Sequence, residues 1–211
     1  MLREHQRNAE ITNPRPNRPW SCILAQLTAR HPTSVSGESC GQSCGAVVIM
    51  GVAGCGKSTL GKAVAQRLGW SMLEGDDFHS DENKARMRTG VPLNDADREG
   101  WLRRLAIQLQ AHKCGVVLTC SALKRAYRES LRAALPELKF VFLDISYEEA
   151  LRRVRARSEH FFPPNLMQSQ FEALERPVNE SGVLRLDAAL PLENLLDQTV
   201  QWLTAESRLA G

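Results

Sequence analysis

An apolar run leads into a glycine-rich turn in the stretch Val47-Val48-Ile49-Met50-Gly51-Val52-Ala53-Gly54-Cys55-Gly56-Lys57-Ser58-Thr59-Leu60. Residues Gly51 to Ser58 fit G-x-x-x-x-G-K-[ST], the pattern of a phosphate-binding loop. The glycines let the backbone turn its N–H groups inward around a polyphosphate, and Lys57 adds a cation for the outer phosphates. Ser58 offers a hydroxyl to Mg²⁺, and the start of the following helix adds its dipole. The stretch therefore predicts a site for a nucleoside triphosphate.

A glycine-rich turn that matches by chance is the alternative, expected in about one chain in a hundred of this size. The functional pattern also requires a strand before the loop and a helix after it. An apolar run precedes the loop, and Leu60, Val64 and Leu68 follow it at helical spacing. We therefore interpret the stretch as a nucleotide-binding loop.

The composition of the 211-residue chain limits its class. This length allows one domain with a core, plus a tail. The net charge of +3 does not suggest a nucleic-acid partner. The sequence has no apolar run of about 18 residues, so no membrane span is expected. The six cysteines form no C-x-x-C pair and no zinc spacing with histidine. We expect reduced thiols and a cytoplasmic protein with neither nucleic-acid nor membrane partners.

Residues 1–44 differ in composition from the rest of the chain. Prolines interrupt the segment, Ser, Asn and Gly are frequent, and no hydrophobic period is sustained. These features predict a disordered N-terminal tail, with the folded domain over residues 45–211. Arginines in the tail leave an organelle-targeting peptide as an alternative, although Glu4, Glu10 and Glu38 argue against one.

Strand and helix patterns alternate along the rest of the chain. Short apolar runs predict strands at 47–50, 71–74, 116–120, 140–145 and 183–186. Helical spacing predicts helices after Lys57, at 81–88, around Trp101 to Leu109, at 123–135, after Ser146, at 166–174 and at 191–203. We expect an α/β fold, a five-stranded parallel sheet with helices on both faces, with a lid at about 158–170.

Three carboxylates, Glu74, Asp76 and Asp77, follow the second predicted strand. Ligands of open α/β sheets collect along the carboxyl edge of the strands. One carboxylate there can take the proton of an acceptor hydroxyl, while another helps to hold Mg²⁺ through water. The alternative is a solvated acidic turn, which the neighbouring phosphate-binding loop disfavours.

Basic residues gather in two further places. Arg153 and Arg157 lie four positions apart on one helix face, before a loop of lid character, where they can clamp phosphates. The alternative is an ordinary solvated helix end. Lys124 and Arg128 lie one helical turn apart and either neutralise an anionic substrate or face solvent. For the histidines at 79 and 160, a structural hydrogen bond and a catalytic role both stay open.

The chain from about Ala46 to Leu203 resembles the gluconokinases, in the group of shikimate and nucleoside monophosphate kinases. Many families share the phosphate-binding loop, but other blocks are more specific. These blocks are Gly75–His79 with Asn83 and Met87, Gly90–Arg98 with Trp101, Cys120–Lys124 with Tyr127 and Arg128, and His160-Phe161 with Ser169-Gln170-Phe171. Ser80 and Gly100 stand where the family usually has proline, and Arg86 where lysine is common.

The resemblance implies ATP-dependent phosphorylation of D-gluconate at its 6-hydroxyl, which gives 6-phosphogluconate for the pentose phosphate pathway. By position, Asp76 would bind the acceptor hydroxyl and serve as base, and Glu74 would approach Mg²⁺ through water. Arg98 would face the gluconate. Arg153 would lie near adenine, and Arg157 would meet phosphates.

The predicted site residues fall into four sets. The catalytic candidates are Lys57, Asp76 and Arg157, and the metal candidates are Ser58 and, through water, Glu74. The candidates for the nucleotide are Gly51, Val52, Ala53, Gly54, Cys55, Gly56, Lys57, Ser58, Thr59 and Arg153. Those for the substrate are Asp76, His79, Arg98, Lys124 and Arg128. The rivals are a shikimate or nucleoside monophosphate kinase of the same fold and a nucleotide-binding regulatory module without turnover, and a homodimer is left open.

Overall fold

A five-stranded parallel sheet organises the computed structural model, which describes residues 45–112, 115–156 and 164–207. Its strand order is β2-β3-β1-β4-β5, with β1 (Ala46–Met50) at the centre. The other strands are β2 (Ser71–Glu74), β3 (Val116–Cys120), β4 (Lys139–Asp144) and β5 (Val183–Asp187). Strands β1 and β3 are almost wholly buried, as their uninterrupted apolar sequences predict for a sheet covered on both faces. The predicted sheet is confirmed.

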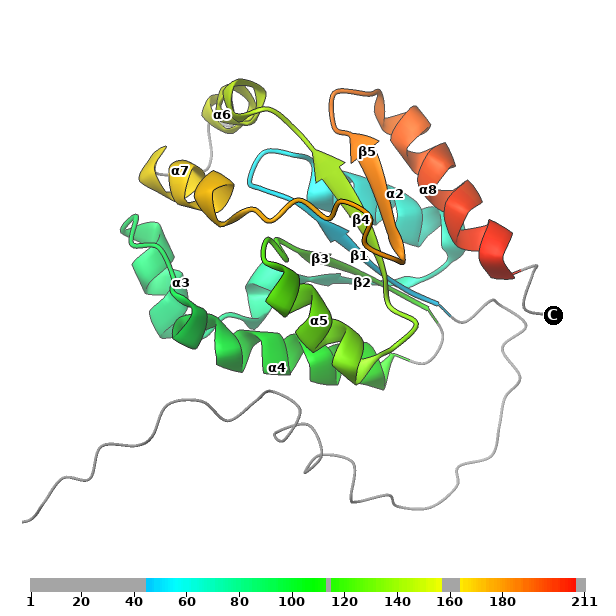
Figure 1. Cartoon of the computed structure of the whole chain (residues 1–211), viewed down its shortest axis with the longest axis horizontal. Helices are drawn as coiled ribbons and strands as arrows, with labels where there is room; N and C mark the ends of the chain where they lie inside the picture. The colour runs from blue at the N-terminus through cyan, green and yellow to red at the C-terminus, as the bar shows by residue number, and fades with distance from the viewer. Residues whose placement is uncertain (1–44, 113–114, 157–163, 208–211) are drawn as a thin grey trace, which may run out of the picture. The chain divides into compact units, whose positions relative to one another are not determined.

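Helices form a layer on each side of the sheet (Figure 1). Helices α2 (Lys57–Leu68) and α8 (Leu192–Ser207) cover one face, and α4 (Asp95–Ala111) and α5 (Arg125–Ala134) cover the other. Each face has its own apolar core: one contains Val47 and Ile49, and the other contains Val48 and Met50. Successive side chains of β1 thus contribute alternately to the two cores. The predicted α/β fold, with helices on both faces of the sheet, is confirmed.

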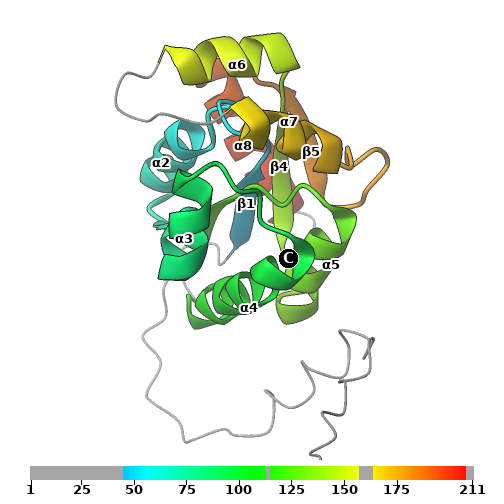
Figure 2. The ribbon, with the colours of Figure 1, turned by 90° about the vertical axis from the view of Figure 1, so that its left-hand side faces the viewer.

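The remaining helices gather beyond the carboxyl ends of the strands. They are η1 (Gly75–Phe78), α3 (Asp81–Arg88), α6 (Tyr147–Arg155) and α7 (Pro164–Ala173). Figure 2 looks onto this edge and shows α3, α6 and α7 in front of the sheet. Since the phosphate-binding loop also leaves β1 at this edge, these helices surround the end of the molecule where ligands collect in such sheets.

Capping side chains set where two helices of this edge begin. The side chain of Asn94 accepts the N–H of Asp97, and the carboxylate of Asp97 accepts the N–H of Asn94 in return, so α4 starts with a capping box. At α6, the Ser146 hydroxyl accepts the N–H of Glu149, whereas the Glu149 carboxylate accepts from Arg152 and Arg153. Helix α5 starts at Arg125, later than predicted, because the backbone of Lys124 is still extended, with φ −91° and ψ 145°.

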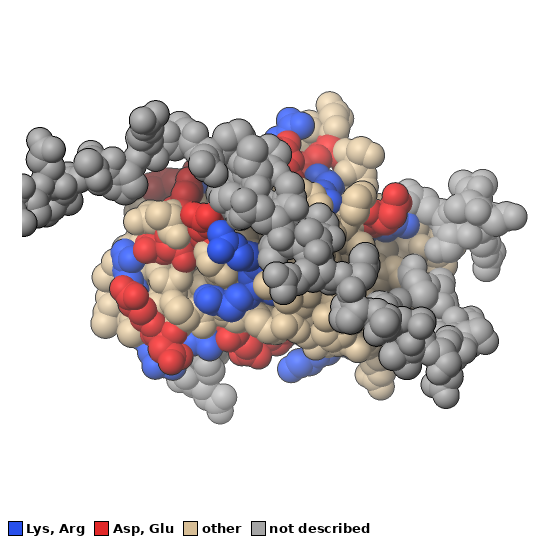
Figure 3. All heavy atoms as spheres, turned by 90° about the horizontal axis from the view of Figure 1, so that it is seen from below, with Lys and Arg blue, Asp and Glu red and all other residues tan. Residues whose placement is uncertain are grey.

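Several expectations concern residues outside the described ranges. The tail at 1–44, Arg157, His160 and the first part of the predicted lid lie there, and α7 spans the lid's second part. Within the described ranges, no helix is long and apolar enough to cross a membrane. Figure 3 shows acidic and basic side chains interspersed on the face seen from below, in keeping with the small net charge.

Candidate active site

The phosphate-binding loop joins β1 to α2. Its glycines Gly51, Gly54 and Gly56 have φ angles of +141°, +81° and +103°, which residues other than glycine rarely adopt. The ammonium of Lys57 lies back along the loop and donates to the carbonyl oxygen of Val52 at 3.0 Å. The loop therefore has the concave backbone and the cation that a polyphosphate requires.

Glu74 lies beside the loop at the end of β2. Its carboxylate accepts hydrogen bonds from the Ser58 hydroxyl at 3.1 Å and from the Thr119 hydroxyl of β3. Thr119 is buried, so it holds the carboxylate from inside the fold. The hydroxyl of Ser58 and the carboxylate of Glu74 form the oxygen-rich pair that Mg²⁺ prefers.

Asp76 and Asp77 lie in η1, a single turn of 3-10 helix with both side chains exposed. The indole N–H of buried Trp101 donates to the carbonyl oxygen of Gly75 at 2.7 Å. Glycine is required at position 75, because a Cβ there would overlap the carbonyl oxygen of Thr119. The turn is thereby anchored to both β3 and α4.

Two cations hold the other side of the same turn. Lys84 of α3 donates to the carbonyl oxygen of Asp77 at 2.8 Å, and Arg104 of α4 donates to that of Phe78 at 2.7 Å. With the indole contact, three side chains from two helices fix the backbone that presents the carboxylates. Such a preorganised turn suits a group that must accept a proton at one place.

The charges of three predicted site residues act on Cys120, at the end of β3. Burial raises the pKa of the Cys120 thiol to about 12, the charge of Asp76 raises it further, and the charges of Lys57 and Arg98 lower it. These charges come from η1, α2 and α4, and they act on the same atom group. Asp76, Lys57 and Arg98, which are far apart in sequence, therefore all lie close enough to Cys120 for their charges to act on its thiol.

A cavity of about 510 Å³ opens next to this point. Its lining includes Asp95 and Arg98 of α4, Lys124 and Tyr127 around the start of α5, and Ser169 of α7. The Lys124 ammonium lies 2.7 and 2.9 Å from the two carboxylate oxygens of Asp95. One of these oxygens, Oδ1, also accepts the Tyr127 hydroxyl at 2.5 Å. These two hydrogen bonds lower the pKa of Asp95, so the carboxylate stays charged.

Arg98 has a different environment in the same cavity. Its Nε is buried without a hydrogen-bond partner, and its guanidinium lies 5.7 Å from the centre of the Tyr127 ring. Within the described part of the chain, Arg98 forms no ion pair, whereas Lys124 is neutralised by Asp95. Arg98 is therefore the cation best placed to bind an anionic ligand in this cavity.

Arg128 fits neither alternative of the sequence analysis, because its side chain is 1% exposed and paired inside the fold. Its guanidinium binds both carboxylate oxygens of Glu180, at 2.7 and 3.0 Å, and donates to the carbonyl oxygens of Ala122 and Leu123. Ala122 has a φ angle of +41°, so these bonds hold a strained turn just before Lys124. Arg128 does not line the cavity and supports its wall instead.

His79 is also buried, and it packs against a ring without the expected structural hydrogen bond at Nδ1, which has no partner among the described residues. Its ring stacks on Trp101, with 4.3 Å between the ring centres. Burial lowers the pKa of His79 to about 4, with the charge of Arg98 acting in the same direction and that of Asp76 opposing it. The imidazole is therefore neutral near pH 7 and packs behind the turn that carries Asp76.

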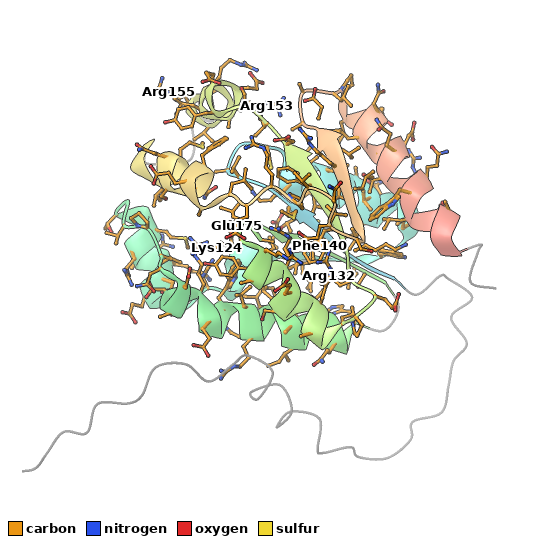
Figure 4. The ribbon with its side chains drawn as sticks, viewed as in Figure 1. Lys124, Arg132, Phe140, Arg153, Arg155 and Glu175 are labelled. Atoms are coloured by element: carbon orange, nitrogen blue, oxygen red, sulfur yellow. The ribbon has the colours of Figure 1, made fainter. Side chains whose placement is uncertain are left out.

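A second cavity, of about 330 Å³, lies beside the phosphate-binding loop. Gly56, Thr59 and Arg153 contribute to its lining, together with apolar side chains such as Leu190. The guanidinium of Arg153 is held by Glu149 at 2.7 Å and by the carbonyl oxygen of Ala188 at 2.9 Å. Figure 4 shows Arg153 and Arg155 on opposite sides of α6, and Arg155 is exposed.

Several known proteins have sequences similar to that of this chain. A family model described as an AAA domain matches residues 47–180. A gluconokinase from Gluconobacter oxydans is 42% identical over 76% of this chain and 92% of its own length. The thermosensitive gluconokinase of Escherichia coli is 40% identical over 73% of this chain and 84% of its own length. The chain belongs to the gluconokinase family.

Solved structures agree with this family assignment. A crystal structure of a gluconokinase from Sinorhizobium meliloti is 40% identical and covers 80% of this chain and 95% of its own, with a TM-score of 0.71. A shikimate kinase from Aquifex aeolicus, at 20% identity and a TM-score of 0.51, shares the fold alone. The resemblance to the gluconokinases is confirmed, and a member of this family is a nucleotide-binding kinase with a small-molecule substrate.

Several residues at this gluconokinase site were not singled out by sequence reasoning. Thr119 is a hydroxyl residue in an otherwise apolar strand, and that contrast is a usable signal for a buried polar contact. Asp95 carried no such signal, because a carboxylate in the first turn of a helix is expected without any ligand. Gln170 was noted only as part of a family block, yet its side chain reaches the phosphate-binding loop.

Proposed function

We propose that this chain transfers the γ-phosphoryl group of ATP to the 6-hydroxyl of D-gluconate and releases 6-phospho-D-gluconate and ADP. The positions of Lys57 in the phosphate-binding loop, of Asp76 in the anchored turn after β2 and of Arg98 in the 510 Å³ cavity carry the proposal. These residues provide a cation for the transferred phosphoryl group, a proton acceptor and a cation for an anionic acceptor, which are the groups this reaction needs. The gluconokinases of similar sequence support gluconate as that acceptor.

The nucleotide would occupy the phosphate-binding loop and the 330 Å³ cavity beside it. Backbone N–H groups of the loop and the start of α2 would surround the phosphates, and Lys57 would neutralise charge on the outer ones. Arg153 would lie along the adenine, since Glu149 and Ala188 hold its guanidinium at that cavity. The role of Arg157 as a phosphate clamp stays a prediction.

Mg²⁺ would be held at Ser58 and, through water, at Glu74. Their side-chain oxygens are 3.1 Å apart, and Thr119 fixes the carboxylate from behind. Mg²⁺ in kinases usually takes one or two protein oxygens together with phosphate oxygens and waters, so this pair fits it. When bound, the ion neutralises charge on the phosphate oxygens.

Gluconate would lie in the 510 Å³ cavity with its terminal hydroxyl toward Asp76. Arg98 would bind the carboxylate of gluconate, because its charge lacks a partner among the described residues. Lys124 and Asp95, already paired, would form hydrogen bonds with the hydroxyl groups along the chain of the sugar acid. As the 6-oxygen attacks the γ-phosphorus, its proton would pass to the carboxylate of Asp76.

A panel of acceptors in a coupled assay for ADP tests the proposal. We expect turnover with gluconate, and a kcat/KM at least about 10²-fold below it for shikimate and for AMP, which lack the flexible polyol between anion and hydroxyl. Preference for shikimate or AMP would assign the chain to the rival kinases. ATP binding without turnover on any sugar acid would instead support a regulatory module.

A further inference from the structure

The proposed mechanism gives no role to a contact between α7 and the phosphate-binding loop. The backbone N–H of Ala53 donates to the side-chain oxygen Oε1 of Gln170 at 2.7 Å, across 117 positions of sequence. Backbone N–H groups of this loop normally face phosphate oxygens, so a side chain that reaches one of them lies where phosphates bind. Gln170 therefore faces the phosphate-binding loop.

The orientation of the Gln170 carboxamide follows from simple chemistry. A backbone N–H can only donate, so the oxygen of the carboxamide must face Ala53 and the Nε2 amino group must point elsewhere. The described residues provide one partner for this side chain, the N–H of Ala53, which bonds to its oxygen. Two N–H donors of a neutral amide are thus available beside the loop.

The neighbours of Gln170 show which part of the nucleotide these donors would meet. On one side, the Lys57 ammonium, the group that reaches the outer phosphates, lies against the carbonyl oxygen of Val52, next to Ala53. On the other side, Ser169 lines the cavity that also contains Arg98. Gln170 therefore contacts the loop next to the residue that holds Lys57, and it directly follows a residue that lines the acceptor cavity.

Packing of α7 explains why Gln170 and not another residue takes this position. Met167, one helical turn earlier, is completely buried in the core, and the ring of Phe171 packs edge-on against Tyr147 with 5.2 Å between centres. These contacts turn the face with Gln170 toward the loop. Gln168 lies on the exposed face and donates to Glu172 within the same helix.

We infer that Gln170 is a further catalytic residue of this kinase: its carbonyl oxygen ties α7 to the loop, and its amide N–H donates to an oxygen of the transferred phosphoryl group. In the transfer, the acceptor oxygen forms a bond to the γ-phosphorus while the bond to the β,γ-bridging oxygen breaks, and the acceptor proton goes to Asp76. Gln170 keeps its protons throughout and stabilises negative charge by hydrogen bonding. The inference rests on the proposed function for the acceptor and its base.

Two substitutions at Gln170 and one control test this role. Gln170→Glu keeps an acceptor for Ala53 but has no N–H, and Gln170→Met has a similar length with neither donor nor acceptor. Gln168→Glu makes the same chemical change on the exposed face of α7. Steady-state kinetics with ATP and gluconate, the Kd for ATP and urea unfolding are measured for the wild type and all three variants.

We expect kcat to fall about 10²-fold in both Gln170 variants, the range for loss of one donor to a transition-state oxygen, with the Kd for ATP and the unfolding midpoint changed little. Gln168→Glu should match the wild type. A kcat within about threefold of wild type in Gln170→Met, or a loss in Gln170→Glu alone, overturns the inference, because charge repulsion then explains the effect. Wild-type protein that phosphorylates another acceptor in place of gluconate contradicts the proposed function instead, and the ratio of kcat between variants, measured with that acceptor, still tests the role of Gln170.

Discussion

In the proposed site, residues Gly51 to Ser58 would form most of the nucleotide side from one continuous loop, whereas the acceptor side would take Asp76, Arg98 and Lys124 from three different parts of the chain. The loop needs only its own backbone angles and the start of α2. The acceptor side needs helices α3, α4 and α5 to hold each group in place. A short motif therefore predicts where a phosphate binds, while the choice of acceptor depends on how separate elements pack.

Loss of the loop's cation is expected to give the largest effect. Lys57→Ala removes the ammonium beside Val52 and should reduce kcat about 10³-fold, because charge on the transferred group loses its cation. The fold should persist, since Lys57 belongs to neither apolar core. Kinetics together with circular dichroism measure both, and near wild-type turnover would contradict the assignment of the nucleotide side.

On the acceptor side, Asp76→Asn should lower kcat about 10²-fold and leave ATP affinity nearly unchanged, as expected for loss of a general base. Asp77→Asn is the matched control. Successive side chains of a 3-10 helix diverge by about 120°, so its effect should be much smaller. An inactive Asp77→Asn beside an active Asp76→Asn would exchange the roles of the two carboxylates.

Arg98→Met tests whether recognition of the acceptor is separate from that of the nucleotide. We expect the KM for gluconate to rise about 30-fold and the KM for ATP to stay within about twofold, because one charge-assisted hydrogen-bonding partner is lost. Arg103→Met, on the exposed face of the same helix, serves as control. An equal rise in both KM values would mean that Arg98 contributes to the nucleotide side as well.

His79 should make the stability of the protein depend on pH, and only at acidic pH. Its pKa is about 4 in the folded protein and about 6.5 when unfolded, so the unfolded chain binds more protons between these values. Its contribution to stability is complete above about pH 6.5 and is lost as the pH falls toward about 4.

His79→Phe keeps a ring against Trp101 but has no imidazole to protonate. Between about pH 7 and pH 4, its free energy of unfolding should therefore fall by on the order of 2 kcal/mol less than that of the wild type. Urea unfolding of both proteins across this range measures the difference. Identical pH profiles would show that the imidazole is not held neutral by its burial.

The sequence by itself determined the sheet, the phosphate-binding loop and the family. Five apolar runs became five parallel strands, and their bounds agree with the prediction to within a residue or two. The glycine spacing of the loop was sufficient to place it between β1 and α2. These features depend on neighbours in the sequence, where periodicity and backbone preference act directly.

Only the tertiary structure decided which polar side chains share a site. Lys124 and Arg128 lie one helical turn apart, and the sequence does not distinguish their environments. In the structure, Arg128 is buried in an ion pair with Glu180, 52 positions away, whereas Lys124 lines the cavity. The contact of Gln170 with Ala53 spans 117 positions in the same way. The partner of a buried polar group depends on which elements pack around it, because burial without a partner is costly, and packing is not visible in local spacing.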